Sequence, residues 1–386
     1  MPEAVIVDAV RTPIGRAFKG SIASLRPDET GAFIVDQLLE RNPDVDPALV
    51  EEVVAGCGLP QGKQAFNIGR IIALLSEKLP LETNGSTIAR YCASGLDAIR
   101  ISANHIVAGQ GDAYVAAGVE FVSQYNERQE AAGAEDQNEK LQGKQEGQPN
   151  AYIEMGLTAV NVAKRYEVSR SDMDKYAQRS QELAVQSQED GFFDREIAPV
   201  TLADGTEVAK DDGPRASSSL EKLSQLDEAF GGGGVTAGNS CPLNDGAAAA
   251  LIMSDTKAKE LGLNPRARIV TAATAANEPE YMGVAPIKAI PKVLERAGMK
   301  IEDVDTVELN EAFAAQVIPI MAECDIPLEK MNPHGGAIAL GHPFGMTGVR
   351  IMTTLLNGLE TDDKQVGLET MCVAGGQGEA MIVERL

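Results

Sequence analysis

The chain has 386 residues, of which 44% are hydrophobic, and its 34 basic and 57 acidic residues give a formal net charge of -23. A chain of this length is too long for one compact core, so we expect two domains, or one domain with a large insertion. Because so acidic a surface repels the phosphates of nucleic acids and of anionic lipids, we expect neither a nucleic-acid nor a membrane partner.

Predicted strands and helices alternate in the first 118 residues. Short apolar runs predict buried strands at residues 4–10, 52–55, 85–89 and 113–117, the last ending at Gly118. Helical spacing of apolar residues, or a cap residue before a short apolar run, predicts helices at residues 29–41, 46–50 and 94–108. This alternation is typical of an α/β fold.

The sequence becomes polar between residues 124 and 150, where no apolar stripe is present. We expect a mobile loop there, at the start of an insertion, because so little apolar area could not offset the entropy of ordering it. Helices are predicted at residues 157–167 and 171–190, the second with Ser169 or Ser171 as its N-cap. Dense apolar sequence returns at residues 245–253.

The second half of the chain repeats patterns of the first half. Residues 267–273 resemble residues 4–10, residues 301–310 resemble residues 46–55, and residues 367–372 correspond in position to residues 111–116. We therefore predict two copies of one α/β domain. The predicted division is a first half (1–118 plus 244–265), an inserted loop domain (119–243) and a second half (266–386).

Cysteine usage and the chain ends indicate the compartment. The five cysteines include no Cys-x-x-Cys pair, so we expect neither a disulfide scaffold nor a metal site. The first residues lack a basic and apolar leader, no run approaches the roughly 20 apolar residues of a membrane span, and the last residues are not a peroxisomal signal. We expect a cytoplasmic protein.

Two segments place reactive side chains next to glycines. Residues 332–348 hold five glycines and two of the chain's three histidines, and His342 there is either a core histidine or a catalytic base. Cys92 lies between a predicted strand and a predicted helix, where a helix N-terminus would lower the pKa of its thiol. The alternative is a buried, inert cysteine, but the small residues 93–95 would let a ligand approach closely.

Two further segments are ambiguous by themselves. Asn310, at the junction of a predicted strand and a predicted helix, is placed to cap that helix, and the next residue, Glu311, would then be exposed. Cys372 precedes a glycine-rich turn, which indicates either a reactive thiol or a hairpin before a last strand at residues 379–384.

Together, four segments resemble the thiolases (acyl-CoA:acetyl-CoA C-acyltransferases), in thiolase order and near thiolase spacing. They are Arg90-Tyr-Cys-Ala-Ser-Gly, Asn310-Glu-Ala-Phe, residues 332–348 and the Cys372 turn. Arg11-Thr-Pro-Ile-Gly, Thr236-Ala-Gly-Asn and Asn244-Asp-Gly-Ala strengthen the match along the whole chain. The resemblance implies a thiolase fold, which has two duplicated α/β halves in five αβαβα layers and an inserted loop domain that binds coenzyme A.

The resemblance also implies a role for each catalytic residue. Cys92 would be the nucleophile that carries the acyl group, His342 the base that activates it, and Cys372 the acid and base that exchanges the α-proton of the substrate. Asn310 would hold a water that forms one oxyanion hole with His342. The N–H groups of Cys92 and Ala374 would form the second. Two oxyanion holes suit a reaction with charged intermediates at two different carbonyls.

Contacts to coenzyme A and the acyl group are implied at Met155, Arg215, Ala237, Cys241, Ala312, Phe313 and Phe344. Met155 could instead be core filler, and Arg215 an ordinary surface arginine. The chain departs from the family at three positions: Ala374 replaces a usual glycine, Cys241 a frequent serine and Glu154 a histidine of some biosynthetic members.

The resemblance predicts an enzyme that cleaves 3-ketoacyl-CoA with coenzyme A, reversibly and through an acyl-cysteine, to acyl-CoA and acetyl-CoA, as in fatty-acid β-oxidation. The alternatives are a short-chain acetoacetyl-CoA thiolase that works by biosynthetic Claisen condensation, and a non-catalytic acyl-CoA or lipid carrier. Coenzyme A would be a substrate and no cofactor is expected. A homodimer or homotetramer is expected by analogy.

Overall fold

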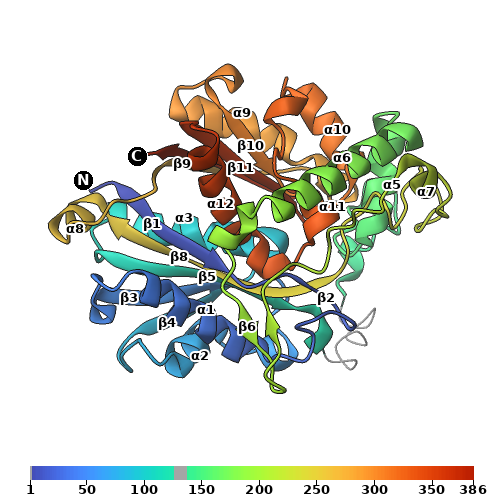
Figure 1. Cartoon of the computed structure of the whole chain (residues 1–386). Coiled ribbons are helices and arrows are strands. Elements are labelled where there is room, and N and C mark those ends of the chain that lie inside the picture. The colour runs from blue at the N-terminus through green and yellow to red at the C-terminus, as the bar shows by residue number, and fades with distance from the viewer. Residues whose placement is uncertain (1, 126–136) are drawn as a thin grey trace.

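The computed structural model describes residues 2–125 and 137–386 (Figure 1). The strands of the first half are β1 (Ala4–Arg11), β2 (Gly15–Arg16), β3 (Val50–Gly56), β4 (Asn84–Ile88), β5 (Ala113–Phe121) and β8 (Asn244–Ser254). Its helices are α1 (Pro27–Arg41), α2 (Ile68–Leu75), α3 (Ser94–Val107) and α8 (Asp255–Glu260). Between β5 and β8 lie α5 (Met155–Arg165), α6 (Arg170–Glu189), β6 (Val200–Thr201), β7 (Glu207–Val208) and α7 (Leu220–Ser224).

The second half repeats this pattern of elements. Its strands are β9 (Ala267–Ala276), β10 (Thr306–Leu309), β11 (Val366–Val373) and β12 (Gln377–Arg385). Its helices are α9 (Pro286–Ala297), α10 (Ala314–Glu323), α11 (Ala337–Leu340) and α12 (Phe344–Thr361).

The order of the strands confirms the predicted duplication. The large sheet runs β10-β11-β12-β9-β1-β8-β5-β3-β4, and β1 meets β9 at the pairs Val5–Arg268 and Ile6–Ala267. Outward from this joint, β8, β5 and β3 on one side correspond to β12, β11 and β10 on the other. The pair β3–β5 and the pair β10–β11 are both parallel, whereas β5–β8 and β11–β12 are antiparallel. The fourth strand of the first half, β4, is an addition at one end.

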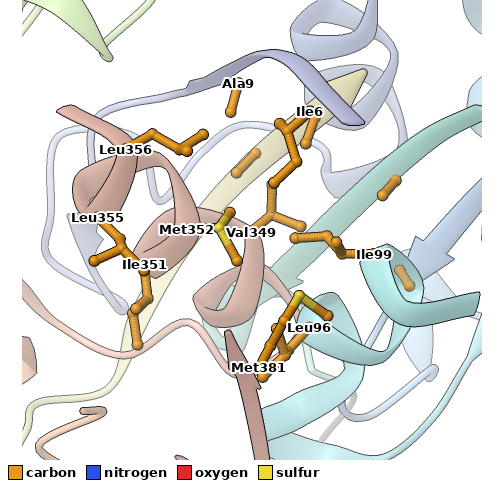
Figure 2. Close-up of a cluster of buried hydrophobic side chains, with 14 of the residues drawn as sticks. Ile6, Ala9, Leu96, Ile99, Val349, Ile351, Met352, Leu355, Leu356 and Met381 are labelled. Atoms are coloured by element: carbon orange, nitrogen blue, oxygen red, sulfur yellow. The ribbon is translucent and has the colours of Figure 1, made fainter. Parts of the chain in front are cut away.

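The helices and strands form five layers. One hydrophobic core surrounds the central layer, and two others lie beneath the outer helices. Side chains alternate along a strand, and an irregularity in β1 between Ile6 and Asp8 shifts this alternation by one residue. As a result Val5, Val7 and Val10 point toward α1 and α2, but Ile6 and Ala9 toward α3 and α12. Figure 2 shows this central core, which contains Ile6 of β1 together with Leu96 and Ile99 of α3, Val349 and Met352 of α12 and Met381 of β12. The third core joins β9 to β12 with α9 and α10. The layers are therefore helices, the first-half strands of the large sheet, α3 with α12, the second-half strands of the same sheet, and helices, as the resemblance implied.

Glycines bring the N-termini of α3 and α12 into backbone contact. A Cβ on Gly95 would lie 2.6 Å from the carbonyl oxygen of Gly345, and a Cβ on Gly348 would lie 2.0 Å from the backbone nitrogen of Leu96. Any side chain at either position would push the two helices apart. The close crossing places Cys92, just before α3, and His342, just before α12, in the same region of the molecule.

Several predicted elements need correction. The strand expected to end at Gly118 continues to Phe121, because β5 stays paired with β8 up to Phe121–Asp245. Gly118 does not end the strand but makes room for the backbone of Gly345, since a Cβ there would lie 2.5 Å from its carbonyl oxygen. Of the two candidate caps of α6, Ser169 accepts a hydrogen bond from the backbone N–H of Asp172 and is the N-cap.

The polar segment predicted as a mobile loop, residues 124–150, falls partly on residues 126–136, which lie outside the described residues. Its described part includes a helical turn at Glu139–Leu141. No helix in the described part of the chain is both long and apolar enough to cross a membrane.

Candidate active site

Cys92 lies in a single helical turn, Tyr91–Ala93, that leads into α3. The hydroxyl of Ser94 closes this turn, since it donates to the carbonyl oxygen of Tyr91 at 2.6 Å and accepts from the N–H of Arg90 at 2.9 Å. The thiol is buried, with 9% of the residue exposed.

The expectation that the helix N-terminus lowers the pKa of Cys92 is wrong. Burial, and after it the charge of Glu120, raise the pKa of the Cys92 thiol to about 12, although the backbone N–H groups of Ala374 and of Cys92 itself act to lower it. Desolvation of a thiolate costs more free energy than these two donors return. Cys92 therefore rests as a neutral thiol, and it needs a base to become a nucleophile.

His342 has the geometry of that base. Its Nδ1 lies 2.7 Å from the hydroxyl oxygen of Thr347, and the Thr347 hydroxyl donates to the carbonyl oxygen of Pro343 at 2.8 Å. The Thr347 oxygen must therefore accept from Nδ1–H, which assigns the proton to Nδ1 and leaves a lone pair on Nε2. Burial, and after it the charge of Arg350, lower the pKa of His342 to about 3. The imidazole is neutral and its Nε2 can accept a proton.

The backbone of His342 is fixed by Asn244 and Gly15 of the first half. Its N–H donates to the side-chain oxygen of Asn244 at 3.0 Å, and the amide of Asn244 donates in turn to the carbonyl oxygen of Gly15 at 3.0 Å. Gly341 has a φ of +113°, and a Cβ there would lie 2.5 Å from the Asn244 side chain. The first half thus holds the histidine of the second half.

Asn310 lies beside His342, as the resemblance implied. Its amide nitrogen is 3.2 Å from Nε2 of His342, and its side-chain oxygen is buried without a hydrogen-bond partner in the structure. The prediction that Asn310 caps a helix is wrong, because α10 begins four residues later, after the extended residue Phe313. The Asn310 side chain therefore faces the site.

Glu311, expected to be exposed in the capping interpretation, is fully buried. Its carboxylate accepts from the hydroxyls of Tyr176 (2.9 Å) and Ser180 (2.6 Å). It also accepts from the amide of Asn332 (2.8 Å) and from the backbone N–H of Ile338 (3.1 Å). This carboxylate joins α6 to the glycine-rich segment that leads to His342.

Cys372 is the second-to-last residue of β11 and is 2% exposed. The side-chain amide of Gln316 lies 3.5 Å from its sulfur. Burial, and then the charges of Cys92 and Cys241, hold the pKa of Cys372 well above its usual value. The thiols of Cys92 and Cys241 are therefore close enough to Cys372 to act on its pKa. The hairpin predicted for this segment is confirmed, since β11 pairs antiparallel with β12.

A cavity of about 170 Å³ is lined mainly by the inserted segment, with Arg16 of the first half and Ile338 of the second half completing its wall. Arg215 and Ala237, both predicted from the sequence, line it, and so do two cations that sequence analysis missed, Arg16 and Lys222. The only sequence signal for Arg16 was its place directly after the Arg11-Thr-Pro-Ile-Gly motif. The lining also includes the polar residues Gln181, Ser217, Ser218 and Ser240 and the apolar residues Leu223, Leu226 and Ile338.

Arg11 anchors the chain that carries Arg215. Its guanidinium is fully buried and binds Asp211 at 2.7 and 2.9 Å and Glu196 at 2.7 Å. The neighbouring Asp212 accepts from the backbone N–H of Arg16 at 2.9 Å. These bonds fix the start of the segment 211–215 to the first half, so the cavity has a rigid base.

The remaining predicted contacts form two groups. Cys241 donates its backbone N–H to the carbonyl oxygen of Ala312 at 3.0 Å, and Phe313 meets Phe230 edge to face at 6.1 Å. Together with half-buried Met155, the first residue of α5, these residues pack on the core of the second half. Phe344 lies elsewhere, with its ring edge to face on His342 at 5.1 Å.

Three residues around the site were missed from the sequence: Thr347, Gln316 and Glu120. Thr347 acts across one helical turn, and Gln316 acts between α10 and β11, so neither contact has a signature in the sequence. Glu120 does have one, because it is a charged residue in the otherwise apolar strand β5. Among the residues that the structure describes, no group of three or more His, Cys, Asp or Glu side chains is placed to hold a metal ion.

The sequence matches two family models, "Thiolase, N-terminal domain" over residues 4–256 and "Thiolase, C-terminal domain" over residues 263–385. It is 42% identical to a 3-oxoadipyl-CoA/3-oxo-5,6-dehydrosuberyl-CoA thiolase of Escherichia coli, with 100% of both chains covered. It is also 42% identical to a 3-ketoacyl-CoA thiolase of a Marinomonas species, over 100% of this chain and 98% of the relative. The dimeric peroxisomal thiolase of Saccharomyces cerevisiae superposes with a TM-score of 0.93 at 38% identity, over 100% of this chain and 98% of the other.

Proposed function

Since the chain belongs to the thiolase family, we propose that Cys92, His342, Asn310 and Cys372 carry out its reaction. The protein is an acyltransferase that cleaves 3-ketoacyl-CoA thiolytically to acyl-CoA and acetyl-CoA. The observation that supports this assignment is the neutral imidazole of His342, whose Nε2 carries no proton, across the α3–α12 crossing from a neutral Cys92 thiol.

In the first half-reaction, Nε2 of His342 accepts the Cys92 proton and the thiolate attacks the C3 carbonyl carbon of the substrate. The C2–C3 bond then breaks, which leaves the acyl group on Cys92 and the electron pair on C2 of the acetyl-CoA enolate. Cys372 gives its proton to C2 and acetyl-CoA leaves. The N–H groups of Cys92 and Ala374, which both approach the Cys92 sulfur, would stabilise the oxyanion at C3.

In the second half-reaction, the Cys372 thiolate accepts the thiol proton of a new coenzyme A. The resulting thiolate attacks the acyl carbon on Cys92 and releases acyl-CoA, and His342 returns its proton to Cys92. The imidazolium of His342, with a water held by Asn310, would stabilise the enolate oxygen of the first half-reaction. Because the acyl group waits on Cys92 between the two halves, the kinetics should be ping-pong.

The cavity lined by Arg16, Arg215 and Lys222 would receive the phosphate end of coenzyme A. Three cations gather there on a chain whose net charge is -23, and guanidinium groups are suited to phosphate. Met155, Ala237, Cys241, Ala312 and Phe313 would line the path of the pantetheine toward Cys92. On this basis the segment 119–243 is a coenzyme-A-binding insertion between the two parts of the first half (1–118 and 244–265), ahead of the second half (266–386).

We further propose a degradative enzyme without a cofactor, located in the cytoplasm and assembled as a homodimer or homotetramer. The relatives named above act on 3-oxoadipyl-type and on general 3-ketoacyl substrates, and the yeast relative is described as dimeric. Phe344, beside His342, would limit the width of the acyl pocket.

Thiolysis of acetoacetyl-CoA and of a ten-carbon 3-ketoacyl-CoA, with the wild type and with Cys92→Ala, tests this function. We expect the wild type to cleave the longer substrate and the variant to cleave neither, because the nucleophile is gone. Cleavage of acetoacetyl-CoA alone would indicate the short-chain thiolase instead. No cleavage by the wild type, with acyl-CoA still bound, would refute the function.

A further inference from the structure

Glu120 is a fully buried carboxylate beside the proposed site with no role in the reaction described above. It is the second-to-last residue of β5. Five donors surround it. Its two oxygens accept from the backbone N–H of Gly58 (2.7 Å), the backbone N–H of Leu59 (3.3 Å), the backbone N–H of Gly345 (2.8 Å), the hydroxyl of Tyr125 (2.8 Å) and the side-chain amide of Gln64.

These donors come from three separate parts of the molecule. Gly58, Leu59 and Gln64 belong to the loop after β3, Tyr125 follows β5, and Gly345 is the second residue of α12, in the other half. The orientation of Gln64 is set by two further bonds, since its oxygen accepts from the N–H of Phe121 at 2.9 Å and its amide donates to the carbonyl oxygen of Leu59 at 2.8 Å. The amide is therefore directed toward Glu120 and not away from it.

The bond to Gly345 makes Glu120 the cap of α12. The residue before this helix is Pro343, which provides no side-chain cap, although the first N–H groups of a helix need acceptors. A carboxylate there also interacts favourably with the helix dipole. An element of the first half thus caps the helix that carries the histidine of the second half.

Gly58 extends this contact to Cys92. A Cβ on Gly58 would lie 2.7 Å from the Glu120 carboxylate, 2.8 Å from Cβ of Phe344 and 3.1 Å from the carbonyl oxygen of Tyr91. The backbone at Gly58 is therefore packed between the carboxylate, the residue after His342-Pro343 and the turn that holds Cys92.

We propose that Glu120 is a positioning residue for thiolysis, whose ionised carboxylate fixes the first turn of α12, with His342 and Phe344, against the turn that carries Cys92. The proposal rests on the function proposed above. All five contacts are donors, so an ionised carboxylate satisfies them, whereas an amide or an acid would direct a hydrogen at one of them.

The charge of Glu120 has a second consequence. After burial, it is the largest cause of the raised pKa of the Cys92 thiol, and it raises the pKa of the buried thiol of Cys57 and of the hydroxyl of Tyr125 as well. Cys92 should therefore stay protonated until His342 accepts its proton. Loss of the charge should make Cys92 ionise at lower pH, an effect that a merely structural residue would not have.

The test compares Glu120→Gln, which removes the charge, with Glu120→Asp, which keeps it but shortens the side chain. The first readout is the rate at which iodoacetamide alkylates Cys92 as a function of pH, followed on the Cys92 peptide by mass spectrometry. The second is kcat and KM for thiolysis. Glu379→Gln, another buried glutamate, on β12, serves as the matched control.

We expect Glu120→Gln to shift the alkylation profile to lower pH, and both Glu120 variants to lose about 10²-fold in kcat with less than a twofold change in the KM for coenzyme A, since small misplacements of reacting groups are this costly. Glu120→Asp should leave the alkylation profile in place. An unshifted alkylation profile in a folded Glu120→Gln would overturn the proposal. If Glu120→Gln does not fold, a wild-type kcat in Glu120→Asp would overturn it instead. The alkylation result does not require thiolysis, so it separates failure of this proposal from failure of the proposed function.

Discussion

The two halves of this molecule place different chemistry at equivalent points of the same fold. In the first half, the entrance to the central helix α3 carries Cys92, and in the second half the entrance to α12 carries His342. The second-to-last residue of β5 is Glu120, and that of β11 is Cys372. The duplicated fold thus carries Cys92 and Glu120 at these two points of the first half, and His342 and Cys372 at the same points of the second half. We propose Cys92 as the nucleophile and His342 as the base.

Burial acts on the two entrances in opposite directions. It raises the pKa of the Cys92 thiol and lowers the pKa of the His342 imidazole, because in each case it disfavours the charged form. Both groups are therefore neutral at rest, and charge develops only when the proton moves between the halves. The two halves therefore share one fold through duplication, and the side chain at each equivalent position determines the chemistry of that half.

Replacement of His342, the proposed base, should reduce thiolysis more than any other substitution considered below. His342→Ala should lower kcat/KM for thiolysis by about 10²- to 10⁴-fold, the usual contribution of a general base. Because the pKa of His342 is about 3, the wild type should also keep its activity without a fall near pH 6 to 7, where an ordinary histidine titrates. A pH profile of kcat/KM between pH 5 and 9 measures this, and an acid limb near pH 6.5 would contradict the assignment of a neutral buried base.

Cys372→Ser should separate the two half-reactions. The variant should lose about 10²-fold in thiolysis, because a hydroxyl is a poor acid and base at neutral pH, but should still take up an acetyl group from acetyl-CoA onto Cys92. Exchange of the acetyl-CoA methyl protons with deuterated water, measured by NMR, should be lost with it. Exchange at the wild-type rate would show that another group moves the C2 proton.

Thr347→Val removes the acceptor of the Nδ1 proton at nearly constant size. A buried N–H without a partner costs about 1–3 kcal/mol, and the wrong tautomer of His342 becomes accessible, so we expect a loss of about tenfold in kcat with little change in KM. Thr347→Ser, which keeps the hydroxyl, is the matched control and should retain most of the activity. Equal losses in both variants would point to packing and not to the tautomer.

Replacement of Arg215, which is not one of the proposed catalytic residues, should have the smallest effect on thiolysis. Arg215→Ala should raise the KM for coenzyme A about fivefold, equivalent to about 1 kcal/mol, and leave kcat unchanged, since a partly exposed ion pair contributes little. The measurement is thiolysis with coenzyme A and with a coenzyme A analogue that lacks its 3'-phosphate. An unchanged KM for both would leave Arg215 as an ordinary surface arginine.

Motifs that act over short sequence distances were predictable from the sequence. The strand–helix alternation, the duplication and the positions of Cys92, His342, Asn310 and Cys372 all depend on local patterns, and the structure places these side chains around the α3–α12 crossing.

Properties that depend on burial were not predictable. The helix start at Cys92 indicated a lowered pKa, but the direction is set by how much of the folded chain covers the thiol. The burial of Glu311 was not predictable either. Only the folded structure brings Tyr176, Ser180 and Asn332 to its carboxylate. Arg16 is far from Arg215 in the sequence, and Lys222 belongs to no recognisable motif. Only the folded structure shows that all three side chains line one cavity.

Isolation of the acyl-enzyme tests directly whether Cys92 carries the acyl group between the two half-reactions. The protein is incubated with acetyl-CoA or with a 3-ketoacyl-CoA in the absence of free coenzyme A, quenched in acid, and mapped by peptide mass spectrometry. We expect one acyl group per chain, on the peptide that contains Cys92, and its release when coenzyme A is added before the quench. An acyl group on Cys372 or Cys241, or none on a chain that still performs thiolysis, would contradict it.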